Sequence, residues 1–171
     1  MRCLAIIFLS LATVVSAQQN KWPVIRHYEG RFTEKVAMPV GGLGAGNISI
    51  GGNGQWKDVE IMNKPAMGFY GAHVPKQAPF FMVFTQKSNG EKKTRTLMGP
   101  IPPSEFAGSE GSRTPNHGLP RFASSTFDAA YPFGIVNLED NNMPVSAKAK
   151  VFNPFIPGDA NASGIPIAVI R

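Results

Sequence analysis

Cysteine is almost absent from this sequence, because Cys3 is the only cysteine among 171 residues. One cysteine can neither form a disulfide within the chain nor supply several thiolates to a metal ion. Histidine is also scarce: His27, His73 and His117 lie far apart, without the short spacing that paired metal ligands usually have. The sequence therefore predicts no metal site, and no motif in it predicts a cofactor.

Charged residues are few as well, at 16% of the chain against 43% hydrophobic residues, which excludes disorder along the whole length. The 17 basic and 11 acidic residues give a net charge of +6, spread along the sequence. A nucleic-acid surface needs its cations concentrated on one face, so we expect no nucleic-acid partner. The densest basic group surrounds a predicted hairpin turn, and we interpret it as the solvated side of an edge hairpin: Lys87, Lys92, Lys93 and Arg95.

Long apolar runs are missing except near the N-terminus, where residues 3–15 are almost wholly apolar. Arg2 precedes this run and Val15-Ser16-Ala17 ends it, which is the pattern of a secretory signal peptide. We predict a signal peptide of residues 1–17 and a mature domain of residues 18–171, secreted or periplasmic. The run is too short for a comfortable transmembrane helix, and no other run approaches that length. We therefore expect no stable membrane span.

A helical period of 3.6 is missing too, whereas a period of two recurs along the mature chain. The 18 glycines and 15 prolines favour short strands joined by turns. Residues 47–50 and 57–62 flank Gly51-Gly52-Asn53-Gly54, a strong hairpin signal. A second hairpin joins residues 133–138 to the alternating strand 145–151. The sequence therefore predicts an all-β fold, an antiparallel β-sandwich of two packed sheets.

Three further segments complete this expectation. Residues 80–84 are apolar on both faces and predict a buried core strand, followed by a turn at 88–90 and a strand at 93–98. Residues 99–120, rich in Gly, Pro and Ser, predict a long surface loop. Residues 165–170 begin another apolar strand that stops at Arg171. We therefore expect an incomplete sandwich, truncated at its C-terminal end, that exposes apolar surface.

The glycine-rich segment 41–46 does not satisfy the pattern of a nucleotide-binding loop. Gly42 and Gly44 would require a third glycine at position 47, where Asn47 stands, and no helical pattern follows. No lysine precedes a serine or threonine there, as a phosphate loop requires. We interpret the glycines as positions where two backbones approach closely at a sheet edge.

Two carboxylates fall on the same face of one predicted strand, and paired carboxylates are the groups that most glycoside hydrolases use. Asp58 and Glu60 are two strand residues apart, which corresponds to roughly 7 Å. A flat aromatic ring can stack on a sugar, so the candidate substrate-proximal residues are Trp56, Asp58 and Glu60. The alternative is that the two carboxylates belong to the solvated face of a sheet. We expect no catalytic residue in this chain.

Four segments resemble one enzyme family in their order and spacing: MPVGGLGAGNIS (38–49), GQWKDVEIMNKP (54–65), YPF (131–133) and VFNPFIPGD (151–159). They are similar to the opening of glycoside hydrolase family 116, which includes non-lysosomal glucosylceramidases and bacterial β-glucosidases. The resemblance implies an N-terminal β-sandwich followed by a catalytic (α/α)6 barrel. It also implies that both catalytic carboxylates belong to that barrel, so none of them maps onto a position of this chain.

Two hypotheses about function remain open. In the first, the chain is the non-catalytic N-terminal β-sandwich of a secreted β-glucosidase or glucosylceramidase-like hydrolase. Its partners are then a catalytic (α/α)6 domain downstream and a carbohydrate or glycoside substrate. In the second, the chain is a free-standing secreted carbohydrate-binding or assembly module without catalysis. Exposed tryptophan and tyrosine at strand ends would support this second hypothesis.

Overall fold

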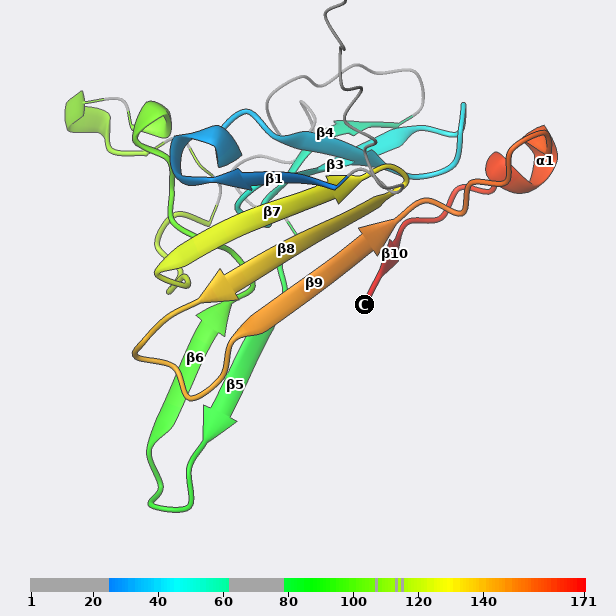
Figure 1. The fold of residues 1–171 in the computed structure, drawn as a ribbon. Coiled ribbons are helices and arrows are strands. Elements are labelled where there is room, and N and C mark those ends of the chain that lie inside the picture. Colours follow the sequence, from blue (N-terminus) through cyan, green and yellow to red (C-terminus); the bar gives the residue numbers. More distant parts are fainter. Residues whose placement is uncertain (1–24, 62–78, 107, 113, 115) are drawn as a thin grey trace, which may run out of the picture.

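The computed structural model of this protein describes residues 25–61 and 79–171 except residues 107, 113 and 115. Strands whose side chains alternate between a buried and an exposed face form its largest sheet. Five antiparallel strands form the sheet, in the order β1–β7–β8–β9–β10 (Figure 1). Phe127 and Val136 lie opposite each other on neighbouring strands, and both are fully buried. The strands are β1 (Arg26–Glu29), β7 (Ser124–Ala130), β8 (Phe133–Glu139), β9 (Ala147–Phe152) and β10 (Val169–Ile170).

A three-stranded antiparallel sheet packs against the larger one. Its order is β2–β3–β4, and its strands are β2 (Ala37–Val40), β3 (Asn47–Gly51) and β4 (Trp56–Glu60). Apolar side chains of the two sheets meet in one core, together with Phe122 and Met143. The predicted β-sandwich and the predicted hairpin around residues 51–54 are therefore confirmed. The core residues contributed by the two sheets are Met38, Val40, Ile50, Trp56, Phe127, Val136, Leu138 and Val151.

Helical structure is short throughout the part of the chain that the structure describes. It consists of the 3-10 turns η1 (Gly30–Thr33), η2 (Pro103–Glu105) and η3 (Gly108–Glu110), and of one helical turn, α1 (Ala160–Ser163). The side chain of Asp159 caps α1, because its Oδ1 accepts a hydrogen bond from the amide of Ala162 at 2.9 Å. Among the described residues, no helix combines the length and the apolar character needed to cross a bilayer. The predicted signal peptide, residues 1–17, lies outside the described residues.

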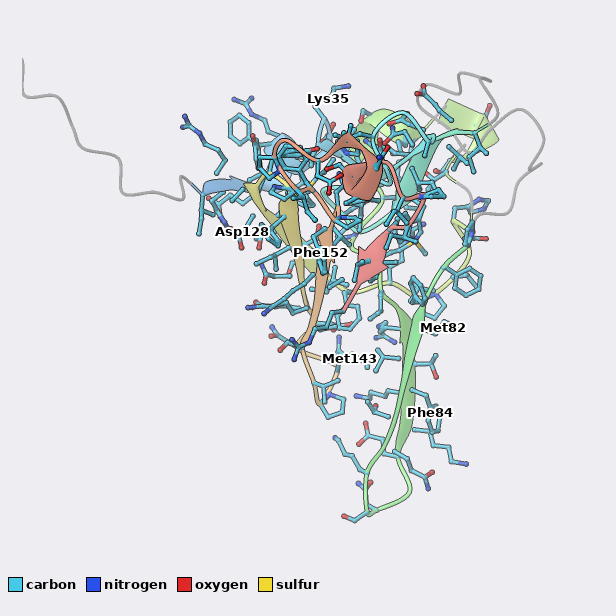
Figure 2. The ribbon with its side chains drawn as sticks, turned by 90° about the vertical axis from the view of Figure 1, so that its right-hand side faces the viewer. Lys35, Met82, Phe84, Asp128, Met143 and Phe152 are labelled. Atoms are coloured by element: carbon cyan, nitrogen blue, oxygen red, sulfur yellow. The ribbon has the colours of Figure 1, made fainter. Side chains whose placement is uncertain are left out.

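The prediction of a buried core strand at residues 80–84 is wrong. The strand there is β5 (Met82–Gln86), which forms a two-stranded hairpin with β6 (Lys92–Thr96), and the hairpin projects beyond the sandwich (Figure 1). Phe84 is 59% exposed, and Figure 2 shows Met82 and Phe84 on the side of the hairpin away from Met143. Apolar residues on both faces are typical of a strand that two layers cover. Here the described residues supply no second layer over β5.

The strand expected at residues 165–170 is shorter than predicted. Within this range only Val169 and Ile170, which form β10, pair with β9. Val169 lies opposite Phe152, and Ile170 lies opposite Val151. Pro166 lacks an amide hydrogen and cannot join a ladder, so Ile165 and Ile167 stay outside the sheet and are exposed. The edge next to β9 therefore presents apolar side chains.

The hairpin of β5 and β6 carries its charges in pairs. The ammonium groups of Lys87 and Lys93 lie 2.7 and 2.9 Å from the carboxylate of Glu91. Their hydrogen bonds lower the pKa of Glu91 to about 2. The guanidinium of Arg95 lies 2.8 Å from the carboxylate of Asp140, in the turn between β8 and β9. The basic group of this hairpin is therefore largely paired within the protein.

An ion pair on the outer face of the large sheet makes the edge strand β1 sensitive to pH. His27 Nδ1 lies 2.6 Å from Asp128 Oδ1, and Asn137 donates to the other oxygen of Asp128 at 2.9 Å. The hydrogen bond between the two raises the pKa of His27 and lowers the pKa of Asp128. The contribution of His27 to stability is therefore complete below its unfolded-state pKa and is lost as the pH rises through the raised value. The contribution of Asp128 is lost as the pH falls through its lowered value.

We expect an NMR titration to place the pKa of the His27 imidazole above about 6.5, the ordinary value of histidine. The Asp128→Asn variant removes the negative partner and keeps a hydrogen-bonding oxygen, so the pKa of His27 should fall toward that ordinary value. Asn137→Ala is the matched control, because it leaves the Asp128 carboxylate in place and should preserve most of the shift. An equal pKa of His27 in wild type and Asp128→Asn would contradict this contact.

Candidate functional site

Trp56, the candidate sugar-stacking residue, begins β4 and lies opposite Ile50 of β3. Its side chain is only 8% exposed, because it packs into the core between the two sheets. A sugar can stack only on a ring whose face reaches the surface. Trp56 therefore acts in this structure as a core residue.

A β-bulge interrupts β4 at the two candidate carboxylates. Asp58 and Val59 together stand opposite Ile48, and Asp58 has a φ of 51°, in the left-handed region. The extra residue moves Glu60 to the face of the sheet opposite to that of Trp56. The unbroken alternation that would place Asp58 and Glu60 on one face therefore does not hold. That a substrate approaches these two residues stays a prediction.

A small polar cavity lies beside β4, where the sequence indicated no site. Lys57 and Glu105 line it, and burial lowers the pKa of the Lys57 amine and raises the pKa of the Glu105 carboxyl. The hydroxyl of Thr114 donates a hydrogen bond to Glu105. Hydrogen bonds of Asn53 join the β3–β4 hairpin to the start of the loop between β6 and β7: its carbonyl accepts from the amide of Gly99 at 2.7 Å, and its side-chain amide donates to the carbonyl of Pro100 at 3.3 Å. Glu105 lies in a segment of loop-like composition, so no local signal could have revealed its burial.

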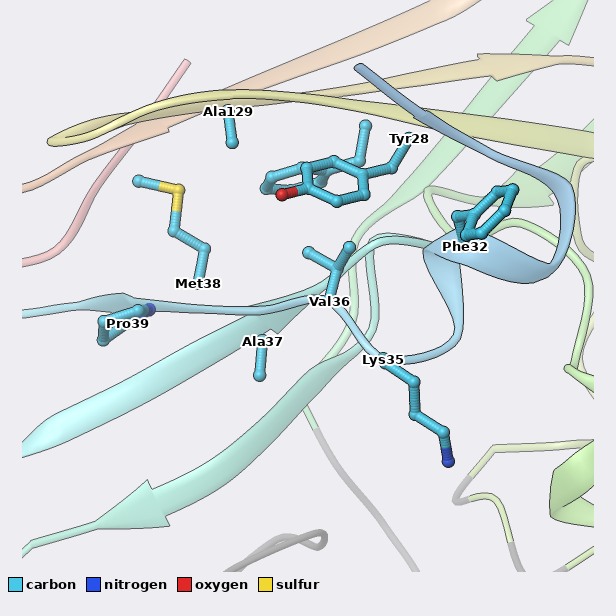
Figure 3. Close-up of a pocket in the computed structure, with 9 residues that line it drawn as sticks. Tyr28, Phe32, Lys35, Val36, Ala37, Met38, Pro39 and Ala129 are labelled. Carbon is cyan, nitrogen blue, oxygen red and sulfur yellow. The ribbon is translucent and has the colours of Figure 1, made fainter. Parts of the chain in front are cut away.

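An apolar groove of about 390 Å³ opens between the two sheets, on the side of β1 and β2 (Figure 3). Tyr28, Met38 and Ala129 face one another across it, and Phe32 lies at its mouth. Among the described residues that line it, the polar side-chain groups are the hydroxyl of Tyr28 and the amine of Lys35. The groove can accommodate an apolar group more readily than a polar one.

Asn153 connects segments that are far apart in the sequence, at the end of the sandwich where β2 and β9 finish. Its buried side chain accepts a hydrogen bond from the amide of Gly41 and donates one to the carbonyl of Pro39 at 3.1 Å. Its backbone amide donates to the carbonyl of Pro132 at 3.3 Å. One asparagine therefore joins the glycine segment, the turn between β7 and β8, and the segment that follows β9.

The glycine segment 41–46 packs backbone to backbone against its neighbours. A Cβ on Gly42 would lie 2.3 Å from the carbonyl oxygen of Ile165, and a Cβ on Gly46 would lie 2.9 Å from that of Glu60. The amide of Leu43 donates to the carbonyl of Ser163 at 2.9 Å. These approaches bear out the prediction that the glycines permit close contact of two backbones.

Parts of the four segments that resemble family 116 thus meet at one end of the sandwich, where Gly46 approaches the backbone of Glu60 and Asn153 joins Gly41 to Pro132. We call this end the junction, and define it as residues 39–46, 60–61, 131–133 and 152–170. Aromatic rings lie on it in pairs: Tyr131 and Phe155 are 5.9 Å apart between centroids, and Phe133 and Phe152 are 5.8 Å apart. Its exposed large apolar side chains are Leu43, Ile61, Tyr131, Phe133, Phe155, Ile156, Ile165, Ile167 and Ile170.

The described residues at the junction are suited to packing contacts more than to catalysis. The junction combines carbon-rich side chains with backbone groups already paired to one another. The described residues contain no cluster of three His, Cys, Asp or Glu side chains that could hold a metal ion. The arrangement is suited to bind a complementary apolar surface.

Comparison with known proteins agrees with this geometry. A search of curated proteins found no match. A family model described as "beta-glucosidase 2, glycosyl-hydrolase family 116 N-term" matches residues 37–171, a range that contains all four segments of the junction. A family of N-terminal domains implies a catalytic domain as partner. This chain belongs to the N-terminal domain family of glycosyl hydrolase family 116.

Proposed function

We propose that this chain is the non-catalytic N-terminal β-sandwich of a secreted β-glucosidase or glucosylceramidase-like hydrolase. It supports a catalytic (α/α)6 barrel that hydrolyses β-glycosidic bonds. The observation that carries the proposal is the family match over residues 37–171. The signal-peptide pattern of residues 1–17 supports secretion.

The geometry of β4 supports a non-catalytic role for this domain. Most glycoside hydrolases use two carboxyl groups that flank the scissile bond. Here the bulge at Asp58 interrupts the strand, so Asp58 and Glu60 are not held as a regular pair on one face. The catalytic pair is therefore assigned to the partner domain.

We expect the chain of residues 18–171 to show no turnover of an aryl β-glucoside, whereas the full-length protein hydrolyses it. The reason is that the resemblance to family 116 assigns both catalytic carboxyl groups to the partner domain, outside this chain. Turnover would be measured by release of the coloured phenol from matched molar amounts of the two proteins. Glu60→Gln in the short chain is the control: turnover by the short chain that this variant abolishes would make Glu60 catalytic and overturn the assignment.

We also expect the exported protein to begin at Gln18. The small residues Val15 and Ala17 precede the cut, after an apolar run of signal-peptide length. Intact-mass measurement checks this even if Gln18 cyclises. An Ala17→Arg variant should block cleavage, because signal peptidase requires a small residue there. Exported wild-type protein that retains Met1 would refute this route of secretion.

A free-standing carbohydrate-binding module is the second candidate, and the exposed rings of Tyr131, Phe133 and Phe155 favour it. The burial of Trp56 speaks against it, because that ring cannot reach a sugar. The reading frame downstream of Arg171 separates the two functions. A helix-rich continuation of several hundred residues supports the hydrolase, and a stop codon supports the module.

A further inference from the structure

Polar side chains lie across the outer face of the large sheet, at the edge where β1 pairs with β7 (Figure 1). His27 of β1 stands opposite Asp128 of β7. Glu29 follows His27 by two residues, and side chains two residues apart on a strand point to the same face. The register therefore gathers one imidazole and two carboxylates on a single solvent-facing area, while Phe127 is buried on the other face of the sheet.

The imidazole of His27 is held in one orientation by its neighbours. Its Nδ1 lies 2.6 Å from Oδ1 of Asp128, close enough for a charge-assisted hydrogen bond. The other oxygen of Asp128 accepts a hydrogen bond from the side chain of Asn137 at 2.9 Å, so the carboxylate is itself fixed. When the neutral imidazole donates its Nδ1 proton to Asp128, its lone pair is on Nε2. His27, whose side chain is 52% exposed, then presents an oriented nitrogen donor to solvent.

A second donor lies next to that nitrogen. Oε2 of Glu29 is 3.9 Å from Nε2 of His27. Two nitrogen and oxygen ligands of a tetrahedral zinc ion lie roughly 3.3 Å apart, since each bond is about 2.0–2.2 Å long. The Glu29 side chain is 76% exposed and can close this difference by rotating. The sequence contains no closely spaced pair of histidines, but here the second donor is a carboxylate on the same strand.

We propose that His27 and Glu29 form a binding site for a divalent transition-metal ion of the zinc class. Asp128 is the positioning residue, because a carboxylate on the second nitrogen of a ligating histidine fixes the ring and raises its basicity. The described residues contain no group of three His, Cys, Asp or Glu side chains that could hold a metal ion. Water therefore completes the coordination, and the site is independent of the proposed hydrolase function.

The donor types favour zinc or copper(II) over magnesium and calcium. Imidazole nitrogen suits the transition metals, whereas magnesium and calcium prefer oxygen donors. The local charge also favours a cation. The carboxylates of Glu29 and Asp128 contribute two negative charges, and the amine of Lys148 on β9 offsets part of them.

The test is a calorimetric titration of the metal-free, full-length protein with zinc chloride at about pH 8, because the imidazole must be neutral to bind. We expect His27→Gln to bind one zinc ion per chain fewer than the wild type, and Glu29→Gln to bind at this site several-fold more weakly. Asp128→Asn should weaken the site by about 10–100-fold, as for other outer-shell partners. His117→Gln is the matched control, because it removes another exposed histidine and should leave zinc binding unchanged.

Copper(II) in place of zinc separates the positioning role of Asp128 from a loss of folding. The electron paramagnetic resonance spectrum of the bound copper should show coupling to one imidazole nitrogen in the wild type and in Asp128→Asn. The coupling should be lost in His27→Gln. An unchanged number of zinc ions in His27→Gln overturns the proposal, as does magnesium chloride that displaces zinc from the site at equal concentration. Equal zinc affinity of the wild type and Asp128→Asn overturns the positioning role.

Discussion

Truncation of Phe127 to alanine is expected to reduce the free energy of unfolding by about 3–5 kcal/mol, the range for large-to-small changes of a buried phenylalanine. Phe127 is 0% exposed and lies on β7, between Tyr28 on β1 and Val136 on β8. Its ring tip also fills the space beside Gly134. The alanine variant would leave a cavity that these strands cannot close. Equilibrium unfolding in urea measures the loss.

Phe84→Ala is the matched control, because it removes the same side chain from β5 where it is 59% exposed. We expect a change within about 0.5 kcal/mol, as for other surface substitutions. The pair of variants also decides between the two interpretations of residues 80–84. A loss for Phe84→Ala as large as that for Phe127→Ala would show that β5 lies in a core after all.

The strands of this protein could be predicted where the signal is local. The turn residues 51–54 and 88–90 each lie between two strands that pair as expected. The alternation of Ala147, Ala149 and Val151 likewise gives β9 and its inner face. A hairpin needs only its own turn chemistry and its own period of two, and both are written in the sequence.

The features that could not be predicted depend on distant partners. The bulge at Asp58 places a non-glycine residue at positive φ. Aspartate adopts this conformation more readily than most residues, but it does so too rarely for the residue type alone to predict a bulge. Glu105 shares a cavity with Lys57 of another segment, and the Asp140 side chain, which is 4% exposed, pairs with Arg95 of β6. An apolar strand such as β5 has the same sequence signature whether its second layer belongs to this sandwich or to another domain.

The candidate site was predicted in part. The four segments that resemble family 116 were found in the sequence, but the meeting of parts of them at one end of the sandwich depends on Asn153 and on the close approach of Gly42 to Ile165. Composition placed the emphasis on Trp56, which is buried, and not on Tyr131 and Phe133, which are exposed. Exposure of an aromatic residue is a property of the packed fold and has no sequence signal of its own.

Gly42→Ala is expected to destabilise the junction through a single methyl group. The new Cβ would lie 2.3 Å from the carbonyl oxygen of Ile165 and 2.7 Å from that of Gly164, so one backbone must move away. Forced overpacking of this kind costs about 1–3 kcal/mol, and occasionally more. The segment around Ile165 should separate first. Hydrogen exchange measures this at the amide of Leu43, which donates to Ser163 and should exchange faster in the variant.

Gly118→Ala separates this steric effect from the general effect of replacing a glycine. A Cβ on Gly118 meets no atom within 4 Å, and neither glycine has the positive φ that would strain an alanine. The free energy of unfolding of Gly118→Ala should therefore equal that of the wild type or exceed it by at most about 0.4–1 kcal/mol, because alanine restricts the unfolded chain. If Gly42→Ala has wild-type stability and unchanged exchange at Leu43, residues 164–165 do not lie against the glycine segment in solution. The junction would then lack one of the contacts that hold it in place.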